Sequence, residues 1–254
     1  MADMIGQHVV VTGAGSGAGE AIALAFALKG ARVTALGRRL APLEAVAVQS
    51  DRIFAVCGDV TDHAGLEVAI AQAVEKNGAP TIVIANAGSA ESAPFLRTSA
   101  DQFQAMVDVN LTGVFNTFQV CLAKMNPKTP GRLIAVASTA GLKGYSYVSG
   151  YCAAKHGVVG LVRSLGQELA RTGVTVNAIC PGFTETPMLA KSIDNIVEKT
   201  GRSREEAEAS LRSVNPQDRF IQPEEIAETA IWLSSDAAAS MTGQAISLSG
   251  GETQ

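Results

Sequence analysis

The chain has few of the residues that build metal centres or disulfide frameworks. It contains 4 cysteines and 3 histidines in 254 residues, and neither type is clustered or shows Cys-x-x-Cys spacing. Each cysteine lies in an apolar stretch, where a buried and reduced thiol is the usual form. We therefore expect no metal site, and no disulfide at Cys57, Cys121, Cys152 or Cys180.

Long apolar runs and an excess of positive charge are also absent. No stretch approaches the ~18 uncharged apolar residues of a membrane-spanning helix, and the opening MADMIGQ lacks the pattern of a signal peptide. The net charge is -4, whereas surfaces that bind nucleic acids are usually rich in Lys and Arg. We therefore expect a cytoplasmic protein with no membrane or nucleic-acid partner, acting on a small molecule.

What the chain does contain is a regular alternation of apolar runs and helical patterns. Seven runs are rich in Val and Ile and continuously apolar, which is typical of strands buried on both faces of a parallel sheet. Strands that alternate with helices predict an α/β Rossmann fold, a doubly wound parallel sheet with helices on both faces, as a single domain over residues 1–254. The predicted strands are 8–13, 31–37, 52–60, 80–88, 131–138, 173–182 and 244–250.

One segment, residues 184–222, interrupts this alternation. It is rich in charged residues and has no strand pattern. We predict two short helices, one over residues 188–199 and one that begins with a capping box at Ser203 and Glu206. Because a long excursion inside a compact domain is usually functional, we expect a helical substrate lid. Amphipathic helices that only pack on the domain are the alternative.

A glycine-rich turn follows the first predicted strand. The segment TGAGSGAGEAIALAF places Gly13, Gly15, Ser16, Gly17 and Gly19 between that strand and a helix. Glycines let the backbone approach a pyrophosphate, and the helix N-terminus supplies N–H donors to it. No Gly-Lys-Ser/Thr sequence follows, which excludes a P-loop. The turn therefore predicts a dinucleotide site, with an ordinary tight turn as the alternative.

The end of the second predicted strand has no carboxylate and carries Arg38 and Arg39 after Gly37. An acidic residue there would bind the ribose 2′-hydroxyl of NAD(H), whereas an arginine accommodates the 2′-phosphate of NADP(H). The sequence therefore favours NADP(H) and leaves NAD(H) possible, because the two arginines could also be solvated charges at a helix start.

Further cofactor contacts are predicted where the third and fourth strands end. An aspartate after the third strand could accept the adenine amino group, or could belong only to its loop. Small residues after the fourth strand would let a ribose lie against the backbone. The predicted contacts are Asp59, Val60, Asn86, Ala87 and Gly88.

All three tyrosines of the chain lie between residues 145 and 155. A tyrosine exchanges protons near neutral pH only if its pKa is lowered from about 10, and a nearby ammonium can do this. Side chains that meet on a helix are three or four residues apart. Lys155 lies four residues after Tyr151, whereas Tyr145 and Tyr147 have no such neighbour. The spacing therefore selects Tyr151 as the acid–base residue.

Taken together, these motifs resemble the short-chain dehydrogenase/reductase family over essentially the whole chain. The resemblance rests on TGAGSGAG, ANAG at 85–88, Asn110, Ser138, Tyr151 with Lys155, and CPGFTETPM. It implies an enzyme that moves a hydride between a nicotinamide and a carbonyl or secondary alcohol. Tyr151 would supply the proton, while Lys155 would lower the pKa of the tyrosine and bind the nicotinamide ribose.

The resemblance implies roles for other residues as well. Ser138, at the end of the fifth predicted strand, would hydrogen-bond the substrate oxygen, and Asn110 would hold a water that links Lys155 to solvent. An ordinary strand-end cap and a polar residue bonded to helix backbone are the alternatives. The segment after the sixth strand would pass under the nicotinamide with Pro181, Gly182, Thr184 and Thr186.

The same resemblance implies a homotetramer or a homodimer. Residues 111–122 and 157–169 support this, because they are apolar over more of their circumference than one sheet face would cover.

The lid segment looks like that of family members acting on 3-oxoacyl or 3-hydroxyacyl thioesters. An apolar face beside a basic rim suits a substrate with a hydrophobic reacting end and an anionic handle, such as a thioester of coenzyme A. Small cyclic or aromatic ketones are an alternative, and so is a regulator that binds the dinucleotide without catalysis. The predicted face contains Phe183, Met188, Leu189, Ile193, Ile196 and Val197, and the rim Lys191, Lys199, Arg202 and Arg204.

Overall fold

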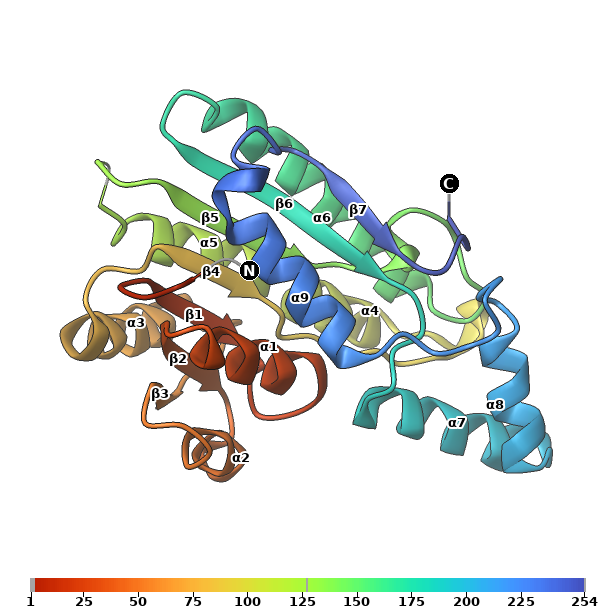
Figure 1. Cartoon of the computed structure of the whole chain (residues 1–254). Helices are drawn as coiled ribbons and strands as arrows, with labels where there is room; N and C mark the ends of the chain where they lie inside the picture. The colour runs from red at the N-terminus through yellow and green to blue at the C-terminus, as the bar shows by residue number, and fades with distance from the viewer. Residues whose placement is uncertain (1–2, 127, 254) are drawn as a thin grey trace.

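Seven parallel strands form the centre of the structure, a computed structural model that describes residues 3–126 and 128–253 (Figure 1). The outermost residues of the predicted domain, 1, 2 and 254, lie outside the described residues. The strand order is β3-β2-β1-β4-β5-β6-β7, which confirms the predicted doubly wound sheet. The strands are β1 (His8–Thr12), β2 (Arg32–Gly37), β3 (Ile53–Cys57), β4 (Ile82–Ala85), β5 (Gly131–Val136), β6 (Val174–Pro181) and β7 (Ala245–Leu248).

Helices cover both faces of the sheet, and each face has its own apolar core. Val9 and Val11 of β1 pack into one core, whereas Val10 packs into the other. This explains why the strands are continuously apolar, since successive side chains point to opposite faces and both faces are buried. One face carries α1 (Gly17–Leu28), α2 (Leu40–Ala47) and α9 (Pro223–Ser234), and the other carries α3 (His63–Asn77), α5 (Gly113–Leu122) and α6 (Ser149–Glu168).

The helical segment that follows Ser99 is divided in the structure. Ser99 and Gln102 form a capping box at the start of α4 (Ala100–Val107). A π-helical segment, η2 (Asp108–Thr112), then joins α4 to α5. Such segments often occur at functional sites, and this one contains Asn110.

The lid segment forms the two predicted helices, α7 (Pro187–Thr200) and α8 (Arg204–Arg212), at one end of the molecule (Figure 1). Its two ends are paired, because Phe183 O accepts from Ile221 N at 2.9 Å and Ile221 O accepts from Glu185 N at 2.9 Å. The helices share a small apolar cluster of their own, centred on Leu189, Ile193 and Ala207. The excursion therefore leaves and rejoins the domain at one point, close to the predicted boundaries.

A buried histidine, His8, links β1 to β2 and to the end of α3. Its Nδ1 lies 2.7 Å from Gly78 O, and its Nε2 lies 2.9 Å from Thr34 Oγ1. Since a carbonyl only accepts, Nδ1 carries the proton and Nε2 accepts from the Thr34 hydroxyl, which itself accepts from Asn77 Nδ2 at 3.1 Å. Burial lowers the pKa of His8 to about 4.

We expect the free energy of unfolding to decrease as the pH falls from 6.5 to about 4. In this range the unfolded chain binds a proton at His8 while the folded protein does not, so acid favours unfolding. The full span corresponds to about 3 kcal/mol. Denaturant unfolding across the range should show the decrease in wild type and in His156→Gln, an exposed control. A His8→Gln variant with an undiminished decrease would contradict the assignment.

Candidate active site

One large cavity lies at the carboxyl ends of the strands, where ligands bind in doubly wound sheets. It has a volume of about 870 Å³ and is walled on one side by residues of α7 and α8. Every residue predicted for the cofactor and for catalysis lines it. These are Gly13, Gly15, Ser16, Gly17, Gly19, Arg38, Arg39, Asp59, Val60, Asn86, Ala87, Gly88, Asn110, Ser138, Tyr151, Lys155, Pro181, Gly182, Thr184 and Thr186.

The glycine turn, which we call the glycine cradle, packs so closely that side chains on its glycines would clash with the protein's own backbone. A Cβ atom on Gly19 would lie 2.2 Å from Gly13 O, and one on Gly13 would lie 2.8 Å from Ala87 Cα. Gly13 and Gly17 also have positive φ values of 67° and 58°, which favour glycine. Helix α1 begins at Gly17, so its N-terminal amides face the cavity. This geometry fits a pyrophosphate.

Two side chains beside the turn also have structural contacts. Asn86 Nδ2 donates to Thr12 O at 3.0 Å and to Gly13 O at 3.3 Å, and so fixes the turn against the end of β4. Asp59 Oδ1 accepts from Thr61 N at 2.9 Å and from Thr61 Oγ1 at 2.8 Å. Asp59 Oδ1 therefore makes hydrogen bonds within its own loop, in agreement with the alternative that Asp59 is a loop residue.

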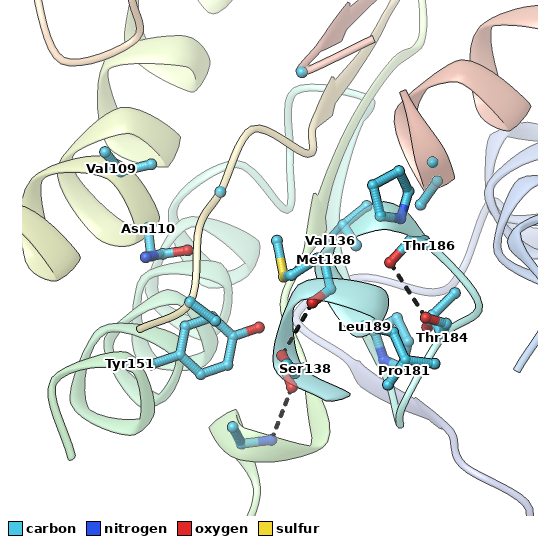
Figure 2. A pocket seen from close by; sticks show the side chains of 18 of the residues that line it. Val109, Asn110, Val136, Ser138, Tyr151, Pro181, Thr184, Thr186, Met188 and Leu189 are labelled. Atoms are coloured by element: carbon cyan, nitrogen blue, oxygen red, sulfur yellow. Dashed lines mark hydrogen bonds between the residues drawn. The ribbon is translucent and has the colours of Figure 1, made fainter. Parts of the chain in front are cut away.

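Ser138 and Tyr151 lie beside one another in the cavity (Figure 2), within reach of a hydrogen bond between their side chains. Ser138 follows β5, and its Oγ accepts from Ala140 N at 3.1 Å. The serine proton is therefore free to be donated to the tyrosine or to a substrate oxygen. This bond favours the phenolate form of Tyr151 and lowers its pKa, but burial has the larger effect and raises the pKa above 10.0.

Lys155 is 3% exposed and lies one helical turn after Tyr151. Its Nζ donates to Val136 O at 2.9 Å and lies 5.6 Å from the centroid of the Tyr151 ring. Burial lowers the pKa of Lys155 to about 8. The predicted pairing is present, but the predicted net lowering of the Tyr151 pKa is not found in this structure, because burial has the largest effect and raises it.

Asn110 is fully buried in η2, and its side chain bonds mainly to backbone atoms. Its Nδ2 donates to Met106 O at 3.0 Å and to Ser89 O at 2.9 Å, and its Oδ1 accepts from Ser89 N at 3.3 Å. The side chain thus joins the helix to the loop after β4. The predicted water-holding role of Asn110 stays a prediction.

The lid contributes part of its predicted apolar face to the cavity. Phe183, Met188, Leu189 and Ile196 line the cavity, whereas Ile193 and Val197 pack inside the lid cluster.

Of the four residues in the predicted basic rim, Lys199 lines the cavity, and its Nζ donates to Ser92 O at 3.3 Å. Arg204 instead pairs with Asp194 at 2.6 Å and with Glu208 at 3.0 Å. Lys191 and Arg202 are not among the lining residues. The prediction of a four-residue rim is therefore wrong, because Arg204 pairs within the lid and only Lys199 of the four lines the cavity.

Two tyrosines that line the cavity were not predicted to belong to the site. Tyr145 and Tyr147 lie in the segment between β5 and α6, and both face the cavity. Tyr147 has a φ of 68°, an uncommon conformation for a large side chain that often marks a functional position. The clustering of tyrosines in this segment was the one signal in the sequence.

Two predicted absences concern metals and membranes. Within residues 3–126 and 128–253, no group of three or more His, Cys, Asp or Glu side chains could hold a metal ion. Among the helices described, none combines the length and the apolar character needed to cross a membrane.

Comparison with known proteins finds the same combination of fold and site. Residues 7–196 match the family model for short chain dehydrogenase. A putative ketoacyl reductase of Streptomyces coelicolor is 37% identical, over 99% of this chain and 98% of its own. The structure of an actinorhodin polyketide ketoreductase with NADPH has a TM-score of 0.93 and 34% identity, covering 97% of both chains.

A second similar structure has a different cofactor. This 3-ketoacyl-(acyl-carrier-protein) reductase from Brucella melitensis, complexed with NADH, has a TM-score of 0.89 and 30% identity, covering 98% of this chain and 99% of its own. The sheet, the glycine turn and these matches over nearly the full length lead to one conclusion. The chain belongs to the short-chain dehydrogenase family of oxidoreductases.

Proposed function

We propose that this protein is an NADP(H)-dependent oxidoreductase that reduces 3-oxoacyl thioesters and oxidises 3-hydroxyacyl thioesters in the reverse direction. One observation carries the proposal. A single cavity is lined by the glycine cradle, by Ser138, Tyr151 and Lys155, and by an apolar part of α7 with one cation, Lys199, at its end. The similar proteins named as ketoacyl reductases support the substrate class.

In this proposal Tyr151 is the proton donor for carbonyl reduction. A bound reduced nicotinamide supplies the hydride to the carbonyl carbon. Ser138 accepts from Ala140 N, so its own proton is available for the carbonyl oxygen, where negative charge develops. Tyr151, held beside Ser138, gives its proton to the same oxygen. The raised pKa of Tyr151 keeps this proton in place at neutral pH.

Lys155 stabilises the phenolate that remains on Tyr151. Its ammonium lies against the ring and is held by Val136 O. A positive charge beside the ring favours the negatively charged product of proton transfer. The remaining N–H donors of Lys155 are available for a nicotinamide ribose, the second role proposed for this residue.

The residues around the cradle fit a dinucleotide phosphate. Gly13, Gly17 and Gly19 line the cavity at the start of α1, where the backbone N–H groups could bind a pyrophosphate. Arg38 and Arg39 are exposed at the end of β2 and line the cavity, where they would pair with the 2′-phosphate of NADP(H). Both cofactors occur among the similar structures, so the two arginines are the support for preferring NADP(H).

The substrate class predicts a preference that kinetics can measure. Acetoacetyl coenzyme A should be reduced with a higher kcat/KM than the same acyl group on a short uncharged thiol, because Lys199 can bind an anionic handle. Lys199→Ala should raise KM for the coenzyme A thioester by up to about fivefold, the scale of an exposed ion pair. It should leave KM for the uncharged thioester unchanged.

Lys191→Ala is the matched control, because it removes the same charge from α7 outside the cavity lining. Equal kcat/KM values for the two thioesters would leave a general carbonyl reductase and contradict the proposed handle.

We also propose that the whole chain acts as one catalytic domain and that α7 and α8 are its substrate lid. The lid cluster and the paired lid ends support the lid.

The proposal further places the protein in the cytoplasm as a homotetramer or homodimer. Exposed Phe103 of α4 and Phe115 of α5 support assembly, because they are apolar side chains left uncovered in one copy.

A further inference from the structure

The side chain of Glu252 is buried, although it belongs to the third-last residue of the chain. Only 2% of its side-chain surface is exposed. Gly250 and Gly251, with φ values of 62° and 97°, precede it and turn the chain back from the end of β7. Glu252 N donates to Ser249 O at 3.2 Å, which holds the turn. The turn at Gly250 and Gly251 therefore places the Glu252 carboxylate inside the protein.

The carboxylate binds two side chains from the segment between β5 and α6. Glu252 Oε1 accepts from the Tyr145 hydroxyl and from Lys143 Nζ at 3.0 Å. The Tyr145 oxygen also lies 2.7 Å from Thr139 Oγ1, and Thr139 is the donor because the tyrosine proton goes to the carboxylate. A buried carboxylate is stable only with such partners.

Tyr145 and Thr139 are the members of this cluster that reach the cavity, whereas Glu252 lies behind them. The Tyr145 ring packs edge-on against Phe183, with centroids 6.2 Å apart. Glu252 Oε2 is 3.1 Å from the position that a Cβ on Gly182 would take. The tail carboxylate therefore supports a wall made by Tyr145 and Phe183, next to the predicted nicotinamide segment.

The hydrogen bonds of Tyr145 also determine which of its atoms can contact a substrate. The hydroxyl of Tyr145 donates to Glu252 and accepts from Thr139. Burial and the bond to Glu252 raise the pKa of Tyr145, so the hydroxyl keeps its proton. With the hydroxyl engaged, the apolar ring is the part left to contact a ligand.

We propose that Glu252 is a positioning residue that holds the Tyr145 ring as a fixed apolar wall of the substrate half of the cavity, and so limits the size of the acyl chain beside Ser138. The inference rests on the proposed function for the substrate class. The fixed ring favours short chains. A mobile Tyr145 ring would open space for longer acyl chains and would weaken the binding of short acyl chains.

A double-mutant cycle tests this coupling. Glu252→Ala should raise KM for acetoacetyl thioester about tenfold and lower kcat less than threefold, and it should shift kcat/KM about tenfold toward a 3-oxooctanoyl thioester. Tenfold corresponds to about 1.4 kcal/mol, the scale of losing a hydrogen bond to a charged group. Glu252→Gln should stay near wild type, because an amide oxygen can still accept from Tyr145.

In a Tyr145→Phe background, Glu252→Ala should change these values less than twofold. Equal effects in both backgrounds, or an unchanged KM in the wild-type background, would overturn the proposal. Thr253→Val is the tail control, since Thr253 bonds to Ser249 and not to the cluster, and its kinetics should match wild type. Thermal unfolding of each variant shows whether it is folded at the assay temperature.

The cycle also separates this inference from the proposed function. If the wild type does not reduce thioesters, the proposed function is refuted, and the same cycle is run with a short-chain and a long-chain ketone that the wild type does reduce. A wild type that reduces thioesters with no coupling between Tyr145 and Glu252 refutes the inference alone.

Discussion

Tyr151→Phe is expected to lower kcat for carbonyl reduction by about 10²–10⁴-fold, the usual contribution of a general acid. The substitution removes one hydroxyl and keeps the ring that packs beside Lys155. The glycine cradle lies on other elements, so the dissociation constant for the cofactor should change only a few-fold. Steady-state rates at saturating substrate measure the first expectation, and a fluorescence titration with NADPH measures the second.

Tyr147→Phe is the comparison variant for this experiment. It removes the same atom from an exposed tyrosine four residues earlier, and its loss of kcat should be much smaller. If Tyr151→Phe kept more than about a tenth of the wild-type kcat, the proton donor would have to be another group.

Arg38→Asp is expected to change the ratio of kcat/KM for NADPH over NADH by at least about 100-fold in favour of NADH. The change removes a guanidinium that can pair with the 2′-phosphate, a charge-assisted bond of about 1.5–3 kcal/mol. It also places a carboxylate where NAD-binding sites hold the ribose 2′-hydroxyl. Steady-state kinetics with both cofactors and one ketone measure the ratio.

Arg171→Asp is the charge-matched control, because Arg171 is exposed and outside the cavity lining. Its ratio should equal that of the wild type. A wild type that already prefers NADH would show that the arginines at the end of β2 do not select the cofactor.

The fold and the centre of the site could be predicted because their signals are local. Val9, Val10 and Val11 are all apolar since they alternate between two covered faces. Tyr151 and Lys155 are one helical turn apart, and the glycines of the first turn follow one another. In each case the physical requirement is met by residues close in sequence.

Other features depend on packing between distant segments. Glu252 meets Tyr145 across 107 positions, and Lys199 meets Ser92 across the same separation. The net direction of the Tyr151 pKa depends on burial, which its helix spacing does not reveal.

Two further features have local signals in the sequence. Glu208 follows Arg204 by four residues and pairs with it, so the loss of Arg204 from the basic rim could have been inferred. Asn110 follows Met106 by four residues and bonds to its carbonyl. A side chain that bonds to its own helix in this way competes with the backbone ladder, which is consistent with the π-helical segment there.

The most direct test of the central claim follows the hydride itself. The protein would be incubated with acetoacetyl coenzyme A and NADPH carrying deuterium at both C4 positions, and the product would be examined by mass spectrometry. We expect a 3-hydroxybutyryl thioester with one deuterium at C3, formed by the wild type and lost with Tyr151→Phe. Consumption of NADPH without deuterium at C3, or no reaction under conditions in which NADPH binds, would contradict the account.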